Sequence, residues 1–351
     1  METLLGKTLV ELQEVALSVG LQKFAGKQLA EWLYVRRVTE FDEMTNISLK
    51  GREALKARYV VGRHAPVREA VSVDGTRKYL FEVQSDKVQG TKEPQFIESV
   101  YIPEEDRTTL CVSTQAGCKM GCRFCMTGTL GFHGHLSAAE ILNQIFYFGD
   151  LTNIVFMGEG EPMDNIDSVL RALEILTADY GCAWSPKRIT VSTVGIPAME
   201  RFLDESECHL AVSMHNPFPS ERALIMPAEK LMSITEVVAL LKHYDWSHQR
   251  RVSFEYICWA RHNDTPRHAR ELLRLLKGLH CRINLIRFHE GVEEVKSQEP
   301  RAEIHFPASN EKQMEWFRDY LTEHGLTTTI RKSRGEDILA ACGMLVNSLN
   351  Q

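Results

Sequence analysis

The pattern of hydrophobic and polar residues changes along the chain. Within the first 60 residues, apolar side chains recur every three to four positions, in residues 9–19 and again in 26–34, which predicts amphipathic helices. Residues 71–83 alternate instead around the pair Asp74-Gly75, which predicts a β-hairpin. A helical part is therefore expected to precede a β extension.

From residue 96 onwards, short apolar runs alternate with helical periods, and the runs 96–102 and 108–113 are the first two expected strands. The elements expected after them are helix 137–148, strand 153–157, helix 165–177, strand 188–193, a short helix from Pro197, strand 209–215, helix 233–244, strand 251–259, helix 265–277, strand 282–288, helix 309–324 and strand 327–332. Six successive βα units predict a parallel sheet that closes, or nearly closes, into a partial (βα)6 barrel.

These elements predict an α/β protein with three parts. Residues 1–62 would form a small helical accessory domain, residues 63–107 a β hairpin and linker extension, and residues 108–351 the barrel. Basic residues in and beside the helical part form either an ordinary solvated face or a pad for an RNA backbone, and interleaved acidic residues leave both interpretations open. They are Lys23, Lys27, Arg36, Arg37, Lys50, Arg52, Lys56, Arg58 and Arg63.

Composition is that of a soluble globular protein, with 44% hydrophobic and 25% charged residues among 351. No apolar run is long enough to cross a membrane, and the N-terminus lacks the layout of a signal peptide. Nine cysteines, an odd number, favour the reducing cytoplasm over a disulfide framework. The net charge of −6 gives no general affinity for nucleic acid, so an RNA partner requires a local gathering of basic residues.

Three cysteines, Cys118, Cys122 and Cys125, fall within eight residues. Structural zinc sites use four protein ligands, and no second Cys or His pair follows. A four-iron cluster takes one thiolate per iron, so three thiolates would leave one iron open to a small molecule. With Phe124 before the third cysteine, the spacing resembles the signature of radical S-adenosylmethionine (SAM) enzymes, whose open iron binds the methionine part of SAM. A zinc knuckle or unrelated surface thiols are the alternatives.

Polar residues follow several of the expected strands. Gly160 and Glu161 lie in Gly-Glu-Gly-Glu-Pro after strand 153–157, where glycines would let the backbone approach a ligand and the carboxylate could accept a hydrogen bond from an amine. The stretch does not fit a dinucleotide fingerprint. Ser192 ends the next strand and Ser213-Met214-His215 ends the one after, as a ligand floor or as ordinary turns.

Two further cysteines stand apart from the triplet. Cys342 lies near the end of the chain, between a charged stretch and Gly343, and Cys111 lies seven residues before Cys118. An isolated cysteine in an apolar stretch is usually a small buried hydrophobic residue. The neighbours of Cys342 instead indicate an exposed turn, so both interpretations stay open.

Taken together, these motifs closely resemble one family, the RlmN/Cfr group of radical-SAM RNA methyltransferases, over nearly the whole chain. The matching segments are 28–33, 41–46, 98–103, 111–118, the cysteine triplet, 157–162, 192–195, 213–215, 263–264, 284–286 and 341–343.

The resemblance implies a catalytic route through two thiols. Cys342 would take a methyl group from one SAM as a thiolate, and the radical made from a second SAM on the [4Fe-4S] cluster would abstract hydrogen from it. The methylene radical would add to an amidine carbon of adenine, which is electrophilic and cannot attack a sulfonium methyl. Cys111 would release the product by forming a transient disulfide with Cys342, and Glu98 would act as general base.

The resemblance also implies SAM contacts, at Gly160, Glu161, Ser192, Ser213, Met214, His215 and His289. Two positions depart from the family pattern. His289 stands where a second Asn is usual, although an imidazole can still bond a ribose hydroxyl. Glu159 stands where Met is common.

The expected activity is methylation of carbon 2 of an adenosine in 23S ribosomal RNA, with tRNA as an additional candidate substrate. Alternatives are carbon 8 methylation, as in Cfr, a radical-SAM enzyme with a non-RNA substrate, and a zinc-dependent RNA-binding protein. Flavodoxin or ferredoxin would supply electrons. We expect a cytoplasmic monomer without membrane contact.

Overall fold

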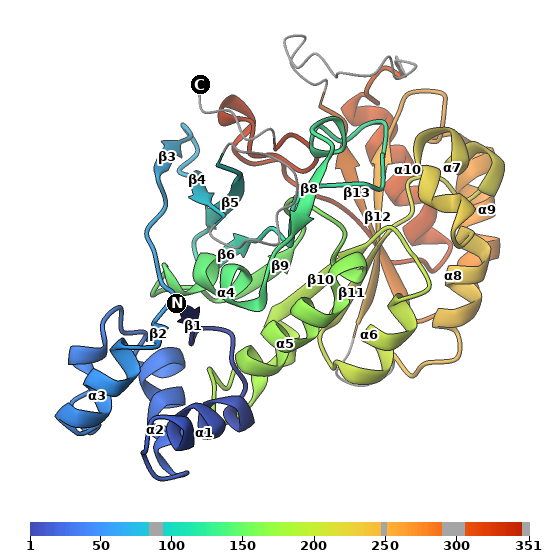
Figure 1. Cartoon of the computed structure of the whole chain (residues 1–351). Helices are drawn as coiled ribbons and strands as arrows, with labels where there is room; N and C mark the ends of the chain where they lie inside the picture. Colours follow the sequence, from blue (N-terminus) through green and yellow to red (C-terminus); the bar gives the residue numbers. More distant parts are fainter. Residues whose placement is uncertain (84–93, 247–250, 290–305, 346–351) are drawn as a thin grey trace.

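The computed structural model describes residues 1–83, 94–246, 251–289 and 306–345. Its first part is helical, as the periodicity predicts (Figure 1). Helix α1 (Leu9–Ser18) begins in a capping box of Thr8 with Glu11. The remaining elements here are α2 (Ala25–Ala30), a π-helical turn (Glu31–Val35), a 3-10 turn (Phe41–Glu43), α3 (Leu49–Lys56), and the paired strands β1 (Glu2–Thr3) and β2 (Tyr59–Val60).

The second part is built on one sheet of ten strands, in the order β14-β13-β12-β11-β10-β9-β6-β5-β4-β3. The strands from β14 to β6 run parallel, and β5, β4 and β3 continue the sheet antiparallel. Their bounds are β3 (Arg68–Val71), β4 (Arg77–Glu82), β5 (Phe96–Pro103), β6 (Thr108–Cys111), β9 (Asn153–Phe156), β10 (Ile189–Thr193), β11 (His209–Ser213), β12 (Val252–Cys258), β13 (Cys281–Arg287) and β14 (Thr328–Ile330).

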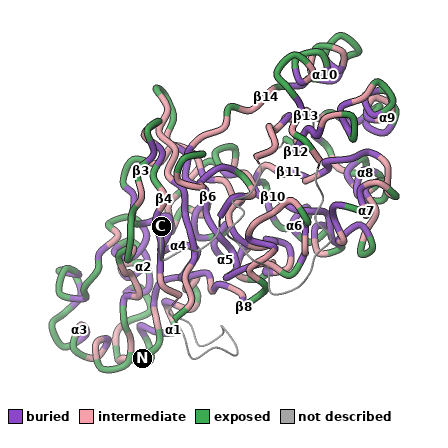
Figure 2. The backbone as a smooth tube through the Cα atoms, turned by 90° about the horizontal axis from the view of Figure 1, so that it is seen from above, coloured by how far each residue is buried: buried purple, intermediate pink, exposed green. Residues whose placement is uncertain are grey.

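Helices connect the parallel strands and cover the outer face of the sheet (Figures 1 and 2). They are α4 (Ala138–Phe146), α5 (Ile166–Thr177), α6 (Met199–Glu205), α7 (Pro219–Ile225), α8 (Ile234–Leu241), α9 (Pro266–Leu276) and α10 (Glu311–Glu323). Six crossovers from β6 to β14 confirm the predicted α/β fold with a partial (βα)6 barrel. The barrel is open, because β14 and β3 are the two edges of the sheet.

Short elements escaped the sequence pattern. The hairpin of β7 (Gln115–Gly117) and β8 (Phe132–His135) and helix α7 were not expected, because each is too short to show a period. The expected strand 108–113 ends two residues earlier, at Cys111. The β7–β8 hairpin and α7 both contact the cysteine loop. The hydrophobic pattern therefore predicted the secondary structure least well close to the site.

Two arginines join the helical part to the barrel. Arg37 donates from Nη1 to the Phe148 carbonyl at 2.6 Å, and Arg63 donates from Nη2 to the Phe146 carbonyl at 2.7 Å. These carbonyls lie at the C-terminal end of α4, where they lack helical partners and where a cation is favoured. Two members of the predicted basic pad therefore have structural contacts.

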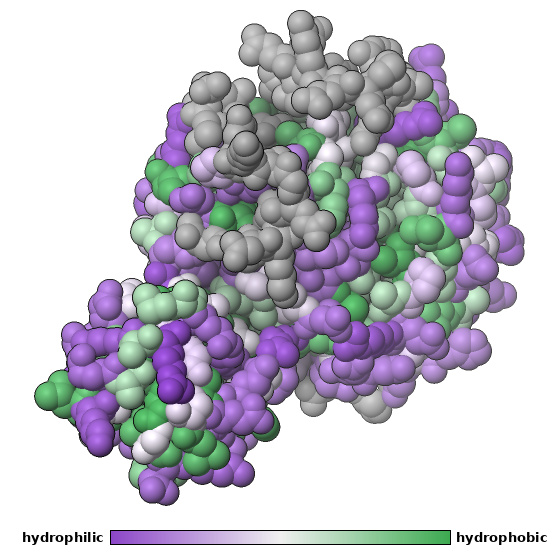
Figure 3. All heavy atoms as spheres, in the orientation of Figure 1, coloured by the Kyte–Doolittle hydropathy of each residue, from purple (hydrophilic) through white to green (hydrophobic). Residues whose placement is uncertain are grey.

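Other basic residues of the helical part also bind within the protein. Lys56 pairs with Asp42 at 2.7 Å, Arg58 donates to the Ser18 carbonyl at 2.9 Å and Arg52 to the Asp42 carbonyl at 2.7 Å. In Figure 3 this part shows hydrophilic and hydrophobic side chains side by side. The surface is therefore mixed, and an RNA pad remains a prediction.

The chain after β14, residues 331–345, is here named the C-terminal strap. It crosses to the hairpin of β3 and β4, where the Gly335 amide donates to Asp74 at 3.1 Å and the Val73 amide donates to Asp337 at 3.1 Å. At its other end the Met126 amide donates to the Gly343 carbonyl at 2.8 Å. The strap thus ties the open side of the barrel to the cysteine loop.

Across the described ranges, no helix combines the length and apolar character needed to traverse a bilayer.

Candidate active site

The cysteine loop leaves the sheet through the neck formed by β7 and β8. Gly117 has φ of +69°, and a Cβ there would lie 2.0 Å from the Gly131 carbonyl oxygen, so only glycine fits. The Cys118 amide donates to that same carbonyl at 2.8 Å. The neck therefore fixes where the first cysteine of the triplet begins.

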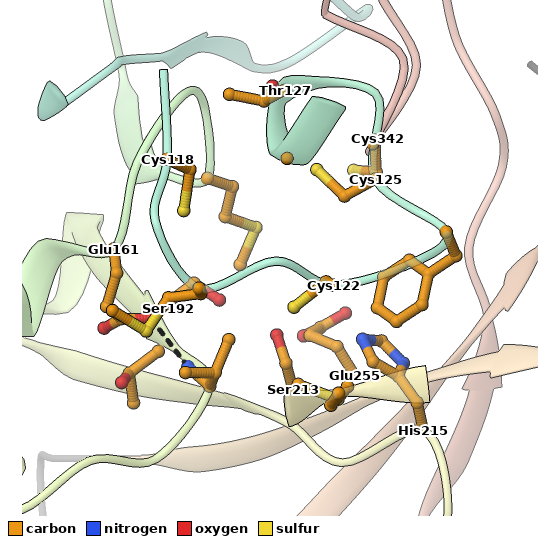
Figure 4. Close-up of a pocket in the computed structure, with 18 of the residues that line it drawn as sticks. Cys118, Cys122, Cys125, Thr127, Glu161, Ser192, Ser213, His215, Glu255 and Cys342 are labelled. Atoms are coloured by element: carbon orange, nitrogen blue, oxygen red, sulfur yellow. Dashed lines mark hydrogen bonds between the residues drawn. The ribbon is translucent and has the colours of Figure 1, made fainter. Parts of the chain in front are cut away.

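The three cysteines line one cavity with several predicted contact residues (Figure 4). Glu161 reaches it from the loop after β9, and Ser192 and Ser213 reach it from the ends of β10 and β11. The predicted residues on its wall are Cys118, Cys122, Cys125, Gly160, Glu161, Ser192, Ser213, His215 and Cys342. The structure thus brings together side chains that the sequence separates by more than two hundred positions.

The thiols of the triplet suit a multinuclear centre. Burial raises the pKa of Cys118 to about 12, and burial together with the neighbouring thiols raises the pKa of Cys122. Deprotonation therefore needs the charge of a bound metal. Within the described ranges, no three His, Cys, Asp or Glu side chains converge on a single ion. A four-iron cluster takes each thiolate on a different iron, so its ligands need not converge on one point.

Glu161 is buried and held by backbone amides. Its carboxylate accepts from the Met163 amide at 3.0 Å and from the Val194 amide at 2.8 Å. Burial raises its pKa to about 7 despite these bonds. A carboxylate has about four acceptor positions, so Glu161 keeps capacity for an amine in the cavity.

His215 presents a defined tautomer to the cavity. Its Nδ1 accepts from the Ile257 amide at 3.0 Å, so the ring proton lies on Nε2. Burial lowers the pKa of His215 to about 3, and the ring is therefore neutral. Phe124 packs edge-on against it, with ring centroids 4.8 Å apart. His215 can donate one hydrogen bond to a ligand.

Met214 and two glycines of the loop after β9 pack closely against other parts of the protein. Met214 is fully buried and does not line the cavity. A Cβ on Gly160 would lie 2.5 Å from the Gln115 side chain, and one on Gly158 would lie 2.7 Å from the Val112 carbonyl. These glycines permit close packing against the preceding loop, and both also line the first cavity, so close approach to a ligand there stays a prediction.

A second cavity adjoins the first. Cys111, on β6, and His289, after β13, line this cavity, and Cys342 and Arg331 line both. His289 bonds the Ser333 hydroxyl of the strap at 2.7 Å. His289 therefore lines the cavity next to the one that contains the cysteine triplet, and its contact with SAM stays a prediction.

Cys342 and Cys111 are both free thiols here. Burial raises the pKa of Cys111 to about 12, and the nearby Cys342 thiol adds to this rise. Desolvation by neighbouring protein raises the pKa of the Cys342 thiol, while Arg331 acts in the opposite direction. Cys342 is nevertheless an exposed residue, as the exposed-turn interpretation predicts, and it lines both cavities, so a small molecule can reach its sulfur.

Glu98 lies on β5, two residues before Val100, the residue paired with Cys111. It lines neither of these cavities. Its carboxylate pairs with Lys78 at 3.0 Å. Its amide donates to Glu159 at 2.7 Å, and Glu159 also accepts from the Gly117 amide at 3.3 Å. Glu159 thus ties β5 to the neck of the cysteine loop.

Two charged residues in the cavity wall were not predicted from the sequence. Glu255, on β12, accepts from Asn284 at 2.8 Å and lies 3.4 Å from Arg331, and both charged residues line the first cavity. The only signal for Glu255 is a carboxylate within an otherwise apolar strand. The pair places a negative and a positive group beside Cys342.

Comparison with protein-family models gives two matches. Residues 112–276 match the radical SAM superfamily, and residues 3–61 match the N-terminal domain of the ribosomal RNA large subunit methyltransferases. The first match contains the cysteine triplet and four successive strands of the sheet, β9 to β12. The second contains the helical part.

Curated relatives match over nearly the full length. A probable dual-specificity RNA methyltransferase RlmN of Bacteroides fragilis is 57% identical, covering 97% of this chain and 95% of its own. The RlmN of Syntrophus aciditrophicus is 38% identical, covering 96% and 94%. Among solved structures, a radical SAM methyltransferase from Sphaerobacter thermophilus aligns with a TM-score of 0.87 at 35% identity, covering 99% of this chain and 100% of its own.

Proposed function

Because the chain belongs to the RlmN family of radical-SAM RNA methyltransferases, we propose that it methylates carbon 2 of an adenosine in 23S ribosomal RNA. The match of residues 3–61 to a domain named for methyltransferases of the large-subunit RNA supports the ribosomal substrate. The dual specificity in the names of the relatives supports a second RNA, which we propose to be tRNA.

The observation that carries this proposal is the position of Cys342 in the wall shared by two cavities, with Cys111 on the second. A sulfur in that wall can receive a methyl group from one side and deliver it to a base on the other. A thiolate is the nucleophile in such a transfer. Arg331 beside Cys342 favours that charged form.

The first cavity fits the family's cofactor. Cys118, Cys122 and Cys125 would hold a [4Fe-4S] cluster, which with SAM supplies a 5′-deoxyadenosyl radical; each turnover consumes two SAM molecules. Glu161 would accept from the amino group of SAM, and neutral His215 would donate from Nε2. Ser192 and Ser213 would offer hydroxyl groups from the floor.

Cys111 would release the methylated base. Its thiolate would attack the Cys342 sulfur, forming an S–S bond and breaking the bond from that sulfur to the methylene carbon. The released electron pair stays on that carbon, which becomes a methyl group on protonation. Before this release, Glu98 would remove the proton from the adenine carbon, which requires its ion pair with Lys78 to break, and the unpaired electron left by radical addition would return to the oxidised cluster.

The cellular setting follows from the same chemistry. All nine cysteines are free, which supports the reducing cytoplasm. A one-electron carrier of the flavodoxin or ferredoxin type would reduce the cluster, and a monomer contains the full set of site residues.

Mass spectrometry of nucleosides from ribosomal RNA and tRNA tests the proposal. Deleting the gene should remove 2-methyladenosine from both RNAs, and the purified protein should restore it in vitro. Appearance of 8-methyladenosine instead would assign the carbon 8 activity. Unchanged RNA together with SAM cleavage would indicate a different substrate.

A further inference from the structure

Arg222 is a completely buried cation whose hydrogen-bond partners include residues that line the first cavity. It lies on α7, a helix between β11 and α8, and its side chain has no solvent exposure. Burying a guanidinium is costly unless its donors are satisfied. Such a residue is therefore expected to have a specific partner set.

Its guanidinium bonds the ends of two neighbouring strands. Nη2 donates to the Val194 carbonyl at 2.6 Å and to the Ser213 carbonyl at 2.8 Å, and Nε donates to the Met214 carbonyl at 3.0 Å. Nη1 donates to the Glu229 carboxylate, which balances the charge. A planar fork can hold three carbonyls in fixed relative positions, which a lysine cannot do.

Each of these carbonyls belongs to a segment that presents a group to the cavity. The amide of Val194 donates to Glu161, so one residue links Arg222 to that carboxylate. Ser213 lines the cavity itself. Met214 precedes His215, whose φ of +55° is uncommon for a residue with a side chain and persists only where neighbours hold it.

Helix α7 also contacts the cysteine loop. The Arg123 amide, between the second and third cysteines, donates to the Ile225 carbonyl at 2.9 Å. The helix that carries Arg222 therefore joins the cysteine loop, the end of β10 and the end of β11. All three segments line the same cavity.

We propose that Arg222 is a positioning residue for SAM: by bonding the carbonyls of Val194, Ser213 and Met214, it fixes Glu161, Ser213 and His215 in the geometry that SAM requires. It does not touch the ligand. The inference rests on the proposed use of this cavity for SAM.

The main test is the double variant Arg222→Gln, Glu229→Gln. Changing Arg222 alone would leave Glu229 buried without its cation, which destabilises a fold by itself. The double variant removes both charges together. SAM affinity is measured by equilibrium titration of the protein with its cluster reconstituted, alongside iron content and thermal unfolding.

We expect the double variant to fold and to retain iron, but to bind SAM about 10- to 100-fold more weakly, a loss comparable to that caused by removing groups that orient the ligands of a metal site. The KM for SAM should rise while kcat at saturating SAM stays within about threefold, because the reacting groups are intact. Arg222→Lys keeps the charge and should also bind weakly. Arg201→Gln, which removes a surface arginine paired with Glu205 and Asp167, is the matched control with unchanged affinity.

Two outcomes would overturn the inference. Parent-like SAM affinity in the folded double variant would show that the strand ends hold their positions without Arg222. Parent-like affinity in Arg222→Lys would show that only charge balance with Glu229 matters, and this variant decides the matter if the double variant does not fold. Failure of the parent protein to bind SAM would instead reject the assignment of the cavity.

Discussion

At the scale of single residues, the site depends on contacts between groups far apart in the chain. Cys342 arrives on the C-terminal strap and Cys111 on β6, and they meet at the second cavity. Glu161 has its carboxylate fixed by two backbone amides. Burial raises the pKa of Cys111 and of Glu161, so variation of pH and substitution of the thiols are suitable tests at this scale.

The two cysteines should give different products when replaced. Cys342→Ala should abolish RNA methylation while SAM cleavage persists slowly, since the first cavity keeps its triplet. Cys111→Ala should accumulate RNA joined covalently to Cys342, visible as a shifted band that RNase collapses. Parent Cys342 peptide should be one methylene heavier by mass spectrometry. Normal turnover of Cys111→Ala without an adduct would reject the two-thiol route.

The pH dependence of SAM binding should report Glu161. The pKa of Glu161 in the folded protein, about 7, exceeds the ordinary value of 4.5. Between these two pH values the folded protein therefore holds a proton that the unfolded chain has lost. The contribution of Glu161 to the free energy of unfolding thus decreases as pH rises from 4.5 to about 7. An ammonium ligand needs the carboxylate form. Calorimetry should therefore show SAM affinity falling about tenfold per pH unit below 7, with proton release on binding. Glu161→Gln should bind weakly and lose this slope; a slope unchanged in Glu161→Gln would exclude the carboxylate.

At the scale of elements, two segments organise the cavities. The cysteine loop is fixed at its neck by Gly117 and along its length by the Ile225 carbonyl of α7. The strap is fixed at one end by the β3–β4 hairpin and at the other by Met126 of the cysteine loop. Each can therefore be perturbed separately from the other.

Replacing one ligand should remove the cluster without unfolding the barrel. Anaerobically reconstituted parent protein should contain about four irons per chain, and Cys122→Ala should lose both iron and SAM cleavage. Cys208→Ala, at a buried cysteine outside both cavities, should retain iron. Circular dichroism checks the fold. Zinc bound in place of iron would contradict the assignment.

Releasing the strap should separate methyl transfer from SAM cleavage. Burial acts to raise the pKa of Asp74, but hydrogen bonds from Thr76 and Gly335 together outweigh it and lower that pKa to about 2. The anchoring contribution is therefore complete above the ordinary pKa of 3.8 and is lost as pH falls towards 2. Asp74→Asn with Asp337→Asn should speed hydrogen exchange in the strap and lower RNA methylation.

SAM cleavage should stay near the parent rate in this double variant, since the triplet is unaffected. Each backbone amide that loses its carboxylate acceptor, at Gly335 or Val73, should lower the free energy of opening the strap by roughly 1 to 3 kcal/mol. Asp106→Asn, at an exposed loop position, is the control and should change neither exchange nor methylation. Equal rates of hydrogen exchange in the strap of the parent, the double variant and Asp106→Asn would show that the hairpin does not anchor the strap.

At the scale of the whole molecule, the helical part and the barrel share one continuous hydrophobic core. Polar contacts add to that core, since Arg37 and Arg63 satisfy carbonyls at the end of α4. His64 and Asn143 exchange two further hydrogen bonds, at 3.0 and 3.1 Å. The helical part is thus held in a fixed position beside the barrel.

Removing both arginines should weaken this attachment. Hydrogen bonds from charged donors contribute about 1.5 to 3 kcal/mol each, so Arg37→Ala with Arg63→Ala should lower the unfolding midpoint in denaturant and separate the transition into two. SAM cleavage should persist, because the cavity lies within the barrel. Arg52→Ala, whose contact stays inside the helical part, should preserve a single transition. A single, unshifted transition in the double variant would contradict the coupling.

The sequence by itself determined the order of strands and helices and the cysteine triplet, because these depend on local periodicity and spacing. It also located Glu161, Ser192 and Ser213 at strand ends, and parallel strands bring such ends to one edge. Family resemblance supplied the roles of Cys111 and Cys342, but only the tertiary structure brought them to one cavity.

Tertiary contacts also decided what local patterns could not contain. His289 faces Ser333 because the strap folds back over the sheet, and Met214 points into the core because a positive-φ turn follows it. No sequence pattern predicted a role for Arg222, because that role depends on hydrogen bonds to three carbonyls at the ends of separate strands. Such juxtapositions arise from sheet register and long-range packing, which no short stretch of sequence specifies.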